Sequence, residues 1–516
     1  MRNFPNILSI QINSANRYAG IMRNLFCLTA GLASLFLVSC SQSAFVPTAS
    51  PNPWSDDYHH VSAMEDYRQW GTYNVHDPSC RKIGDYYYMY STDAIYRENR
   101  KQAEEKGVPL GYIQMRRSKD LVHWEFLGWA FPEIPREAVE WVHAHAGGQG
   151  ATNIWAPYIV PYKDRYRLYF SVSAFGRKTS YIGLAESASP EGPWKQMGCV
   201  VRTDETTAMN AIDPSVVVDP ANGKWWLHYG SFFGGLYCLE LNPSTGLPLV
   251  EGDKGHLIAR RANYRKDNLE APEIIYHSEL KQYYLFTSYD PLMTTYNVRV
   301  GRSDKAEGPF TDFFGKQLKD TTNNFPILTA PYRFDNHPGW AGTAHCSVFT
   351  TDDGRFFMAH QGRLSPHNLM MDLHVRQVFF TDDGWPVVSP ERYAGTQPRR
   401  FRAADLVGEW EVIRVQEPLY ERRLEAGQIL WGEGELKEEE WNRSRKLQFA
   451  KGGELANGAG SWAFVEDKQG LTLTLDGEPI DNLIVFAGHD WENEQETVLF
   501  TGLDARGRSV WGKRVK

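Results

Sequence analysis

The stretch Ile212-Asp213-Pro214-Ser215, followed by Val216-Val217-Val218 and the aromatic run Trp225-Trp226-Leu227-His228-Tyr229, shows a pattern that recurs along most of the chain. A short polar opening leads into an apolar run, a turn with Gly, Asp or Lys, and an aromatic strand, which is typical of a β-hairpin. Five copies at spacings of tens of residues predict a propeller or a solenoid. The other four open at His76-Asp77-Pro78-Ser79, Trp155-Ala156-Pro157-Tyr158, Glu270-Ala271-Pro272-Glu273 and Ala344-His345-Cys346-Ser347.

A second, shorter strand pair follows every aromatic hairpin. The second copy continues through residues 181–185 to the turn Pro190-Glu191-Gly192-Pro193-Trp194, and the fourth through 298–303 to Glu307-Gly308-Pro309-Phe310. Five units of about four strands each predict an all-β fold, a five-bladed β-propeller over residues 61–398. No amphipathic helix of useful length competes with this interpretation.

Equivalent positions of the repeats should meet in space, because the innermost strand of each propeller blade starts near the central axis. Glu270 lies one residue before such a position, so three carboxylates and a histidine are expected at one mouth of the axis. Glu273 and Asp290 are expected to be less axial. The aligned positions are Asp77, Ala156, Asp213, Ala271 and His345.

The pattern changes at about residue 399. Residues 406–413 alternate like a strand, as do 471–475 and 497–500, and Gly-containing turns separate them. These features predict a small β-barrel or sandwich domain over 399–516. We expect it to have a packing or substrate-shaping role and no catalytic residue.

Composition narrows the class of protein. The chain has 516 residues, 42% of them hydrophobic, which favours a folded globular protein. Its net charge of −8, spread without long blocks of like charge, argues against a nucleic-acid partner. The 13% aromatic content fits either aromatic-rich β-structure or stacking on sugars. Cys80, Cys199, Cys238 and Cys346 lack metal-site spacing and are predicted to be buried free thiols.

The N-terminal segment is typical of an export signal. Arg23 precedes an apolar run over residues 25–38, which is short for a bilayer span. Leu37-Val38-Ser39-Cys40 resembles a bacterial lipobox, with Cys40 as the lipidated residue; an ordinary signal peptide is the alternative. Residues 1–40 are therefore predicted to be a signal peptide, with Met22 as an alternative start, and 41–60 a flexible tether. An exported lipoprotein of the periplasm or cell surface is expected.

Three carboxylates around one axis suit glycosidic bond hydrolysis. One protonated carboxyl must protonate the leaving oxygen, and one carboxylate must activate water or attack carbon. A third can raise the pKa of the acid by like-charge repulsion. Asp77, Asp213 and Glu270 provide such a set, although a single Asp-Pro is usually only turn chemistry.

Residues 73–389 resemble glycoside hydrolase family 43, and most closely its endo-α-1,5-L-arabinanases. Some larger members of this group carry a β-barrel domain, and the C-terminal region resembles that domain. The resemblance rests on several motifs together: Val75-His76-Asp77-Pro78-Ser79, Ile154-Trp155-Ala156-Pro157, Val172-Ser173-Ala174-Phe175-Gly176, Ala211-Ile212-Asp213-Pro214, Gly230-Ser231-Phe232-Phe233-Gly234-Gly235, Glu270-Ala271-Pro272 and Ala344-His345-Cys346-Ser347-Val348-Phe349.

This resemblance implies an inverting hydrolase of arabinan or arabino-oligosaccharides. Asp77 would be the general base, Glu270 the general acid, and Asp213 the residue that tunes and orients the acid. His345 would help to hold a calcium ion, largely through waters; a hydrogen-bonded core histidine is the alternative, and Cys346 departs from the commoner Asn. By the same resemblance, Trp155, Phe175 and Phe232 would bind sugar, with core packing as the alternative for each.

Two other functions stay open at this point. An exo-acting arabinofuranosidase or β-xylosidase would use the same chemistry, and loops such as 93–109 or 131–152 would decide the mode of attack. A non-catalytic glycan-binding propeller would not need an acid–base pair. His143 and His145 are expected in an exposed loop rather than a metal site, and 93–109 as a solvated loop or short helix. The membrane is expected to be a partner only through the lipid anchor, and the oligomeric state is not predicted.

Overall fold

The protein was examined as a computed structural model, which describes residues 64–94, 97–108, 110–261, 268–320, 322–366, 371–417 and 436–515. All of them belong to one compact unit, residues 47–516. The predicted signal peptide, Cys40 and the tether lie outside the described residues. Among those described, no helix combines the length and apolar character needed to cross a bilayer.

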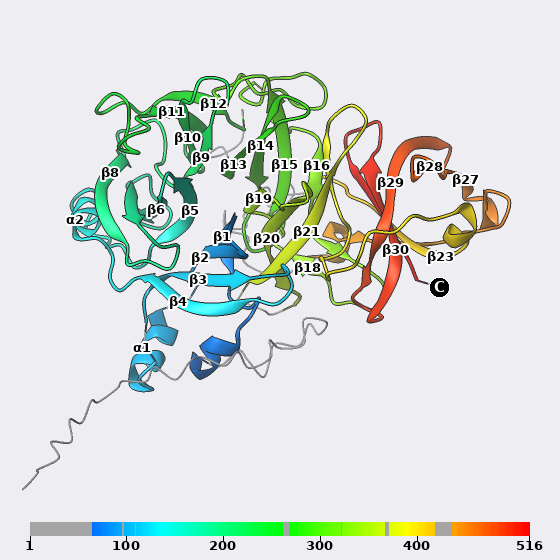
Figure 1. Ribbon diagram of the computed structural model, residues 1–516, viewed down its shortest axis with the longest axis horizontal. Helices are drawn as coiled ribbons and strands as arrows, with labels where there is room; N and C mark the ends of the chain where they lie inside the picture. Colours follow the sequence, from blue (N-terminus) through cyan, green and yellow to red (C-terminus); the bar gives the residue numbers. More distant parts are fainter. Residues whose placement is uncertain are drawn as a thin grey trace, which may run out of the picture. The chain divides into compact units, whose positions relative to one another are not determined.

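Four sheets of four antiparallel strands form regular propeller blades, each with its strands in chain order (Figure 1). The aromatic runs of the repeats are their second strands, which are buried along most of their length because other sheets pack on both faces. The strands are β1 (His76–Ile83), β2 (Tyr86–Thr92), β3 (Tyr112–Ser118), β4 (Glu125–Phe131); β5 (Trp155–Tyr162), β6 (Arg165–Ser173), β7 (Ser180–Ser187), β8 (Lys195–Thr203); β9 (Ser215–Val218), β10 (Trp225–Tyr229), β11 (Leu236–Leu241), β12 (His256–Ala259); β13 (Leu269–His277), β14 (Gln282–Tyr289), β15 (Asn297–Ser303) and β16 (Ile327–Thr329).

The fifth repeat does not form a separate four-stranded sheet, so the expectation of five such sheets was wrong in this respect. Its strands pair in the order β19-β20-β21-β22, but β20 extends past the end of β19 and also pairs with β18. The sheet continues through β17 to β24, giving seven strands in all. Its strands are β17 (Tyr332–Arg333), β18 (Trp340–Ala341), β19 (Cys346–Thr350), β20 (Phe356–Leu364), β21 (Asp372–Phe380), β22 (Pro386–Val388) and β24 (Asn442–Arg443).

The first strands of the five repeats form a closed ring. Strand β1 contacts β5 and β19, β9 contacts β5 and β13, and β13 contacts β19. The aligned residue at each opening has a left-handed backbone, with φ between 43° and 57°, a conformation that non-glycine residues seldom adopt. We call these five the opening residues: Asp77, Ala156, Asp213, Ala271 and His345.

Each opening residue donates its backbone N–H to a side chain of the preceding repeat. These five bonds, of 2.8–3.1 Å, run once around the ring, so that each repeat is tied to the one before it. The acceptors are Gln361 for Asp77, Thr92 for Ala156, Ser171 for Asp213, the Asp213 carboxylate for Ala271, and Ser288 for His345.

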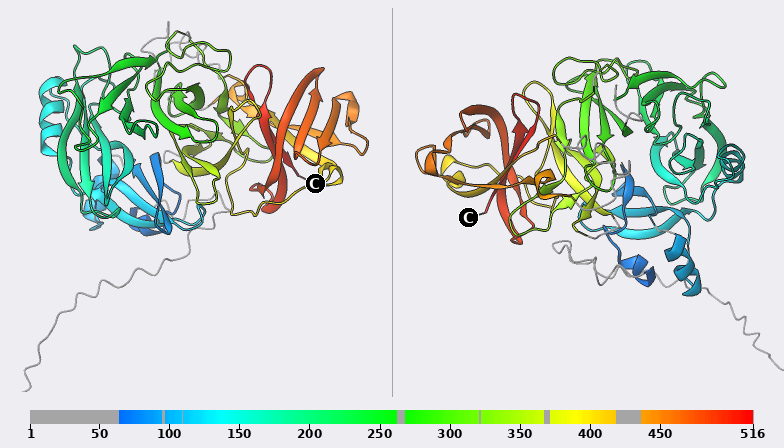
Figure 2. Two further views of the ribbon diagram at one scale, coloured as in Figure 1. Left: turned by 45° about the horizontal axis from the view of Figure 1, so that its top comes forward. Right: turned by 180° about the vertical axis from the view of Figure 1, so that it is seen from behind.

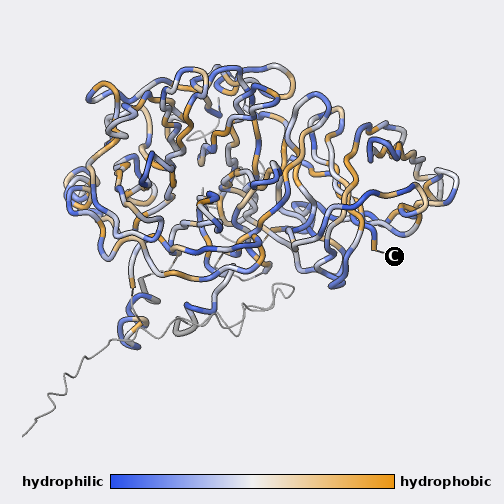
Figure 3. Tube along the Cα trace, in the orientation of Figure 1, coloured by the Kyte–Doolittle hydropathy of each residue, from blue (hydrophilic) through white to orange (hydrophobic). Residues whose placement is uncertain are grey.

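The apolar cores lie between neighbouring sheets. Leu168 and Phe170 of β6 pack with residues of β3 in one cluster, and Tyr169 packs with Leu227 of β10 in another. Neighbouring residues of one strand therefore enter different cores, as the alternation of side chains in a strand requires. Figure 3 shows hydrophobic segments along the strands and hydrophilic ones in many outer loops.

Two short helices cover the outside of the propeller. Helix α1 (Arg97–Glu105) lies in the insert for which a loop or short helix was expected. Helix α2 (Arg136–His145) carries His143 and His145, so the expectation of a loop there was wrong. It buries only Ala138 and Val142, and this narrow apolar stripe explains why the pattern was missed. Three-residue to six-residue 3₁₀ helices lie at η2 (Met64–Gln69), η4 (Ala403–Leu406), η5 (Glu438–Glu440) and η6 (Ala456–Gly458).

The C-terminal region forms a closed β-barrel, in agreement with the predicted barrel or sandwich. Stacked rings of Trp410, Phe449 and Trp462 fill part of its interior. Its strands are β23 (Gly408–Arg414), β25 (Arg445–Phe449), β26 (Glu454–Leu455), β27 (Gly460–Val465), β28 (Gly470–Leu475), β29 (Glu478–Asp490), β30 (Gln495–Leu503) and β31 (Ser509–Arg514).

Barrel and propeller are joined by direct contacts, and Figure 2 shows the barrel strands beside the last sheet. Ser509 Oγ donates to the Ile327 carbonyl at 2.9 Å, and Thr501 Oγ1 to the Val388 carbonyl at 2.7 Å. Strand β24 also pairs in parallel with β17.

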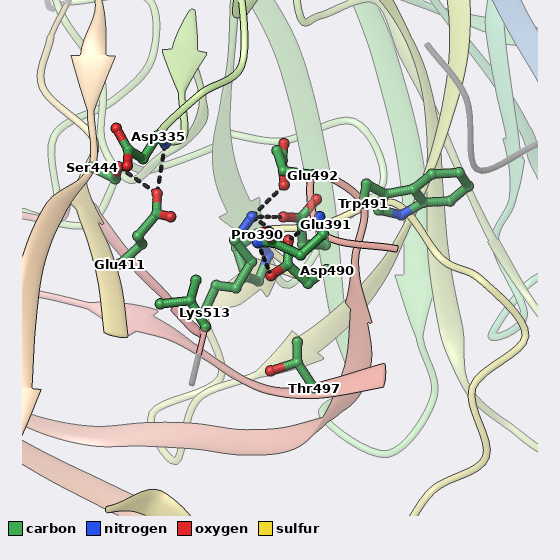
Figure 4. Close-up of polar contacts among 12 residues, drawn as sticks. Asp335, Pro390, Glu391, Glu411, Ser444, Asp490, Trp491, Glu492, Thr497 and Lys513 are labelled. Atoms are coloured by element: carbon green, nitrogen blue, oxygen red, sulfur yellow. Dashed lines mark hydrogen bonds and ion pairs between the residues drawn. The ribbon is translucent and has the colours of Figure 1, made fainter. Parts of the chain in front are cut away.

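A buried ionic cluster lies where the connecting segment meets the barrel (Figure 4). The Lys513 ammonium is fully buried and lies 2.9 Å from both Glu391 Oε1 and Asp490 Oδ1, and it also pairs with Glu492. A single ammonium cannot neutralise three carboxylates. Burial and the negative charge of Glu492 therefore raise the pKa of Glu391 well above its usual range.

The four cysteines within the described part of the chain are free, as predicted. Cys80, Cys238 and Cys346 are buried, and Cys199 is half-buried.

Candidate active site

Asp77 opens β1 and is surrounded by groups that stabilise its charge. Its Oδ1 lies 2.8 Å from His345 Nδ1 and 3.2 Å from His76 Nε2, and its Oδ2 accepts a 2.8 Å bond from Thr92 Oγ1. Burial opposes ionisation, but the two histidines and these bonds outweigh it and hold the pKa of Asp77 well below its usual range. Asp77 is therefore an ionised acceptor at neutral pH.

Glu270 lies on β13 and has the opposite tendency. Burial raises the pKa of Glu270 above its usual range, and the nearby Asp77 charge adds to the rise. Two hydroxyl donors oppose it: Ser231 Oγ lies 2.6 Å from Oε2, and the Tyr296 hydroxyl lies 2.7 Å from Oε1. A raised pKa favours the protonated form, which a general acid requires.

Asp213 connects to the Glu270 segment through the backbone. Its Oδ2 accepts the N–H of Ala271, the residue that follows Glu270, at 3.1 Å. Burial raises the pKa of Asp213 well above its usual range; His345 opposes this rise, whereas Glu270 and Asp77 add to it. The structure thus brings the three predicted carboxylates together with His345, although their individual roles stay predictions.

His345 is bound to Asp77 rather than placed in a group of metal ligands. Burial lowers its pKa, but Asp77, Asp213 and Glu270 outweigh burial and raise it to about 9. Within the described residues, the one group of three or more side chains able to share a metal ion is Glu391, Asp490 and Glu492, away from His345. Calcium, which takes six to eight oxygen ligands, would have to obtain most of them at His345 from water.

The predicted aromatic residues differ in exposure. Trp155 directly precedes Ala156 and is partly exposed, and Phe175 is 53% exposed. Their rings meet edge to face with centroids 6.3 Å apart. Together they offer ring surface at this end of the second blade. Phe232 is only 4% exposed, which fits the packing alternative better than a sugar-binding role.

Sequence reasoning missed four polar residues at the site. Thr92 lies at the end of the aromatic strand of its repeat, as Ser171 and Ser288 lie near the ends of theirs, so alignment of the strand ends could have found it. Ser231 and Tyr296 hold Glu270 from two different loops and carry no repeat signal. Glu273 was expected to be less axial, but it contacts two neighbouring inner strands through Ser215 and Val348.

A comparison with protein families shows which family the chain belongs to. The family model of glycosyl hydrolases family 43 matches residues 71–386, more than half of the chain. The chain belongs to glycosyl hydrolases family 43. A second model, described as the C-terminal lipocalin-like domain of family 43 proteins, matches residues 390–512 and so covers the barrel.

Two of the proteins similar to this chain cover most of its length or share its fold. An extracellular endo-α-(1→5)-L-arabinanase of Thermotoga petrophila is 27% identical over 487 residues, which cover 86% of this chain and 94% of that protein. The crystal structure of the endo-1,5-α-L-arabinanase from Thermotoga petrophila RKU-1 superposes with a TM-score of 0.71 at 26% identity, covering 86% of this chain and 99% of that one. An extracellular exo-α-(1→5)-L-arabinofuranosidase of Cellvibrio japonicus is 30% identical but covers only 61% of this chain and 86% of its own length.

Proposed function

We propose that this family 43 glycoside hydrolase cleaves internal α-1,5-L-arabinofuranosidic bonds of arabinan. The observation that carries the proposal is the pairing, at one mouth of the axis, of an acid with a low pKa and an acid with a raised pKa. Asp77 lies beside two histidines that outweigh the effect of burial, whereas the two hydroxyl donors at Glu270 do not. Environments that separate two carboxyl groups in this way define a base and an acid.

The proposed mechanism is a single displacement with inversion. Asp77 accepts a proton from the water that attacks the anomeric carbon, and Glu270 donates its proton to the leaving oxygen. Asp213 orients Glu270 through the Ala271 amide, and the Asp77 charge disfavours the charged form of Glu270. Trp155 and Phe175 would stack against sugar rings.

Internal cleavage is favoured over exo action by the extent of the similarity. The endo-acting relative from Thermotoga petrophila matches through propeller and barrel, over 86% of this chain. The exo-acting relative from Cellvibrio japonicus matches 61% of it. We therefore infer internal cleavage, the mode of attack named for the relative that matches this chain over both domains.

We also infer that the propeller has five blades, with the larger sheet as the fifth. Its strands β19 to β22 are ordered like those of the four regular blades. The five opening residues and their five interblade hydrogen bonds support this count, because each repeat occupies an equivalent place in the ring.

Debranched arabinan, incubated with the purified protein, tests the activity. Mixed oligosaccharides are expected as early products, with inverted anomers in proton NMR spectra recorded during the reaction. A single small sugar would indicate exo action, and unchanged polymer a binding protein. Glu270→Gln should lower kcat by about 10²–10⁴-fold while leaving the melting temperature close to that of the parent. Glu279→Gln, at an exposed carboxylate in the turn between β13 and β14, is the matched control and should remain fully active.

A calcium ion is proposed to bind at His345. With Nδ1 bound to Asp77, the Nε2 atom would be the side-chain ligand once the ion displaces its proton, and water would supply the other positions. A bound cation there would stabilise negative charge near the carboxylates. Calorimetric titration of chelator-treated protein with Ca²⁺ is expected to show binding that His345→Ala abolishes; no binding to the parent, or equal binding to the variant, would contradict the proposal.

We further propose export and lipid attachment at Cys40. The relatives from Thermotoga petrophila and Cellvibrio japonicus are described as extracellular, which supports export. In a bacterium that processes lipoproteins, the full chain should fractionate with membranes and Cys40→Ser should not. Cys199→Ser, a change at a thiol within the propeller, should leave the fractionation unchanged.

A further inference from the structure

Beneath the proposed catalytic carboxylates, a second set of side chains links the inner strands. Each member stands two residues after an opening residue and accepts a backbone N–H from a neighbouring inner strand. We call this set the axial belt. Its bonds are Cys80 N–H to Ser347 (3.1 Å), Ile159 N–H to Ser79 (3.1 Å), Ile274 N–H to Ser215 (3.1 Å) and Val348 N–H to Glu273 (2.8 Å).

Glu273 is the exception in the belt, because the other three members are serines. Its second oxygen accepts a 3.0 Å bond from Ser215 Oγ, so the carboxylate of β13 holds both β9 and β19. It is 2% exposed. A serine in this place would be too short to reach both neighbours.

Arg81 pairs with this carboxylate from β1, with its Nη1 3.7 Å from Glu273 Oε1. The same guanidinium donates to the Val348 carbonyl at 3.3 Å and to the Tyr158 hydroxyl, and it lies over the Tyr158 ring. Arg81 and Glu273 together therefore contact all five inner strands.

This network is close to the proposed catalytic groups along the chain. Ser79 follows Asp77 by two residues, Ser215 follows Asp213 by two, and Glu273 follows Glu270 by three. The pairing of β13 with β14 shifts register between Glu270 and Glu273, so Glu273 anchors the ordinary strand just beyond the bulge. A displacement there would move Glu270 and the Ala271 amide that binds Asp213.

We propose that Arg81 and Glu273 are positioning residues for this hydrolase, setting the spacing of Asp77, Asp213 and Glu270 from below. The inference rests on the proposed function, since it concerns the same three carboxylates. Catalytic groups misplaced by about 1 Å can lose about 10²-fold in rate. Because the pair is proposed to act through the inner strands and not on the sugar, its loss should lower kcat and leave substrate binding nearly unchanged.

Glu273→Gln tests the proposal with a defined α-1,5-linked arabino-oligosaccharide. It removes the charge partner of Arg81 but keeps an acceptor of similar size. We expect kcat per folded molecule to fall about 10–100-fold, with KM within about twofold of the parent. Glu411→Gln is the matched control: Glu411 is also a buried glutamate with two hydrogen-bond donors, Asp335 N–H and Ser444 Oγ, but it lies in the barrel (Figure 4). Its kcat should equal that of the parent.

Tyr158→Phe provides a second test in case Glu273→Gln does not fold. It removes only the hydroxyl that receives the Arg81 bond, so kcat should fall by a smaller factor, again without a change in KM. An unchanged kcat in folded Tyr158→Phe or Glu273→Gln, or an equal loss in Glu411→Gln, would overturn the proposal. An inactive parent, or a fully active Glu270→Gln, would instead overturn the proposed function.

Discussion

Single residues at the site acquire their chemistry from their immediate partners. Asp77 and Glu270 are both carboxylic acids on inner strands, yet the first is surrounded by histidines and a threonine and the second lies, partly buried, between two hydroxyls. Donors that favour the charged form lower a pKa, and burial raises it. The assignment of base and acid therefore rests in part on neighbours from other repeats, His345 for Asp77 and Ser231 for Glu270.

Tyr296→Phe should shift the pH dependence of activity upward. The Tyr296 hydroxyl donates to Glu270 and so lowers its pKa, which burial otherwise raises. Without that bond the pKa of Glu270 rises further, and its protonated form persists to higher pH. The alkaline limb of kcat/KM against pH should move to higher pH, with a loss of activity at the optimum of up to about 10-fold.

Tyr284→Phe is the control for this experiment. The Tyr284 hydroxyl donates to the Gly384 carbonyl in the turn between β21 and β22, and it touches no carboxylate at the site. Its pH profile should match that of the parent. An alkaline limb of Tyr296→Phe that stayed in place, or moved to lower pH, would show that Tyr296 does not act on the acid.

At the scale of elements, the repeats share an unusual backbone conformation as well as a sequence pattern. All five opening residues adopt the left-handed conformation, although none of them is glycine. Such a conformation costs about 1–2 kcal/mol per residue. Here the hydrogen bonds that the backbone N–H groups of the opening residues donate to the preceding repeat offset that cost. They also fix the start of each inner strand.

Ala156→Gly should be nearly neutral for stability. Glycine adopts the left-handed backbone without strain, and this gain offsets the extra freedom of the unfolded chain. The free energy of unfolding in urea should stay within about 0.5 kcal/mol of the parent. Ala185→Gly, at a fully buried position of β7, relieves no backbone strain, so its free energy of unfolding should fall by about 1 kcal/mol. Equal losses in both variants would show that the opening is not strained.

The sequence was most informative where the same pattern of residues occurred in several repeats. Aromatic runs and polar openings identified the second and first strands of each repeat, and alignment of the openings brought Asp77, Asp213 and His345 to one place. Helix α2 was missed because it buries so few side chains. Tyr296 and Ser231 lie in loops without counterparts in the other repeats, so no alignment could select them. The extension of the last sheet was also beyond prediction, since it depends on a strand from a distant segment.

At the scale of the whole molecule, a buried cation holds the barrel to the propeller. Lys513 of β31 binds Glu391 of the connecting segment together with Asp490 and Glu492 (Figure 4). Buried charges persist only when they are paired, so each partner depends on the others. The cluster therefore makes the barrel and the end of the propeller one cooperative unit.

Lys513→Met should destabilise the protein by about 3–5 kcal/mol. The variant leaves three carboxylates without their cation, and the loss of Lys513 raises the pKa of Glu391 and Glu492 in the folded state above that of the unfolded chain. The folded state then binds more protons, so its stability falls as pH rises. Urea unfolding should show a larger loss at pH 8 than at pH 5. Lys446→Met, which removes an exposed partner of Asp335, should change stability little at either pH. A loss independent of pH would mean that packing alone is affected.

The parallel pairing of β17 with β24 also bears on any attempt to obtain the propeller alone. Asn442 and Ser444 donate their N–H groups to the carbonyls of Pro331 and Arg333, and so they cap the outer edge of the last sheet. A chain shortened to residue 398 would leave that edge bare, and bare edges recruit strands from other molecules. The C-terminal region thus protects this sheet edge from pairing with other molecules. A shortened enzyme should elute from a size-exclusion column as aggregates, even where its catalytic groups are intact.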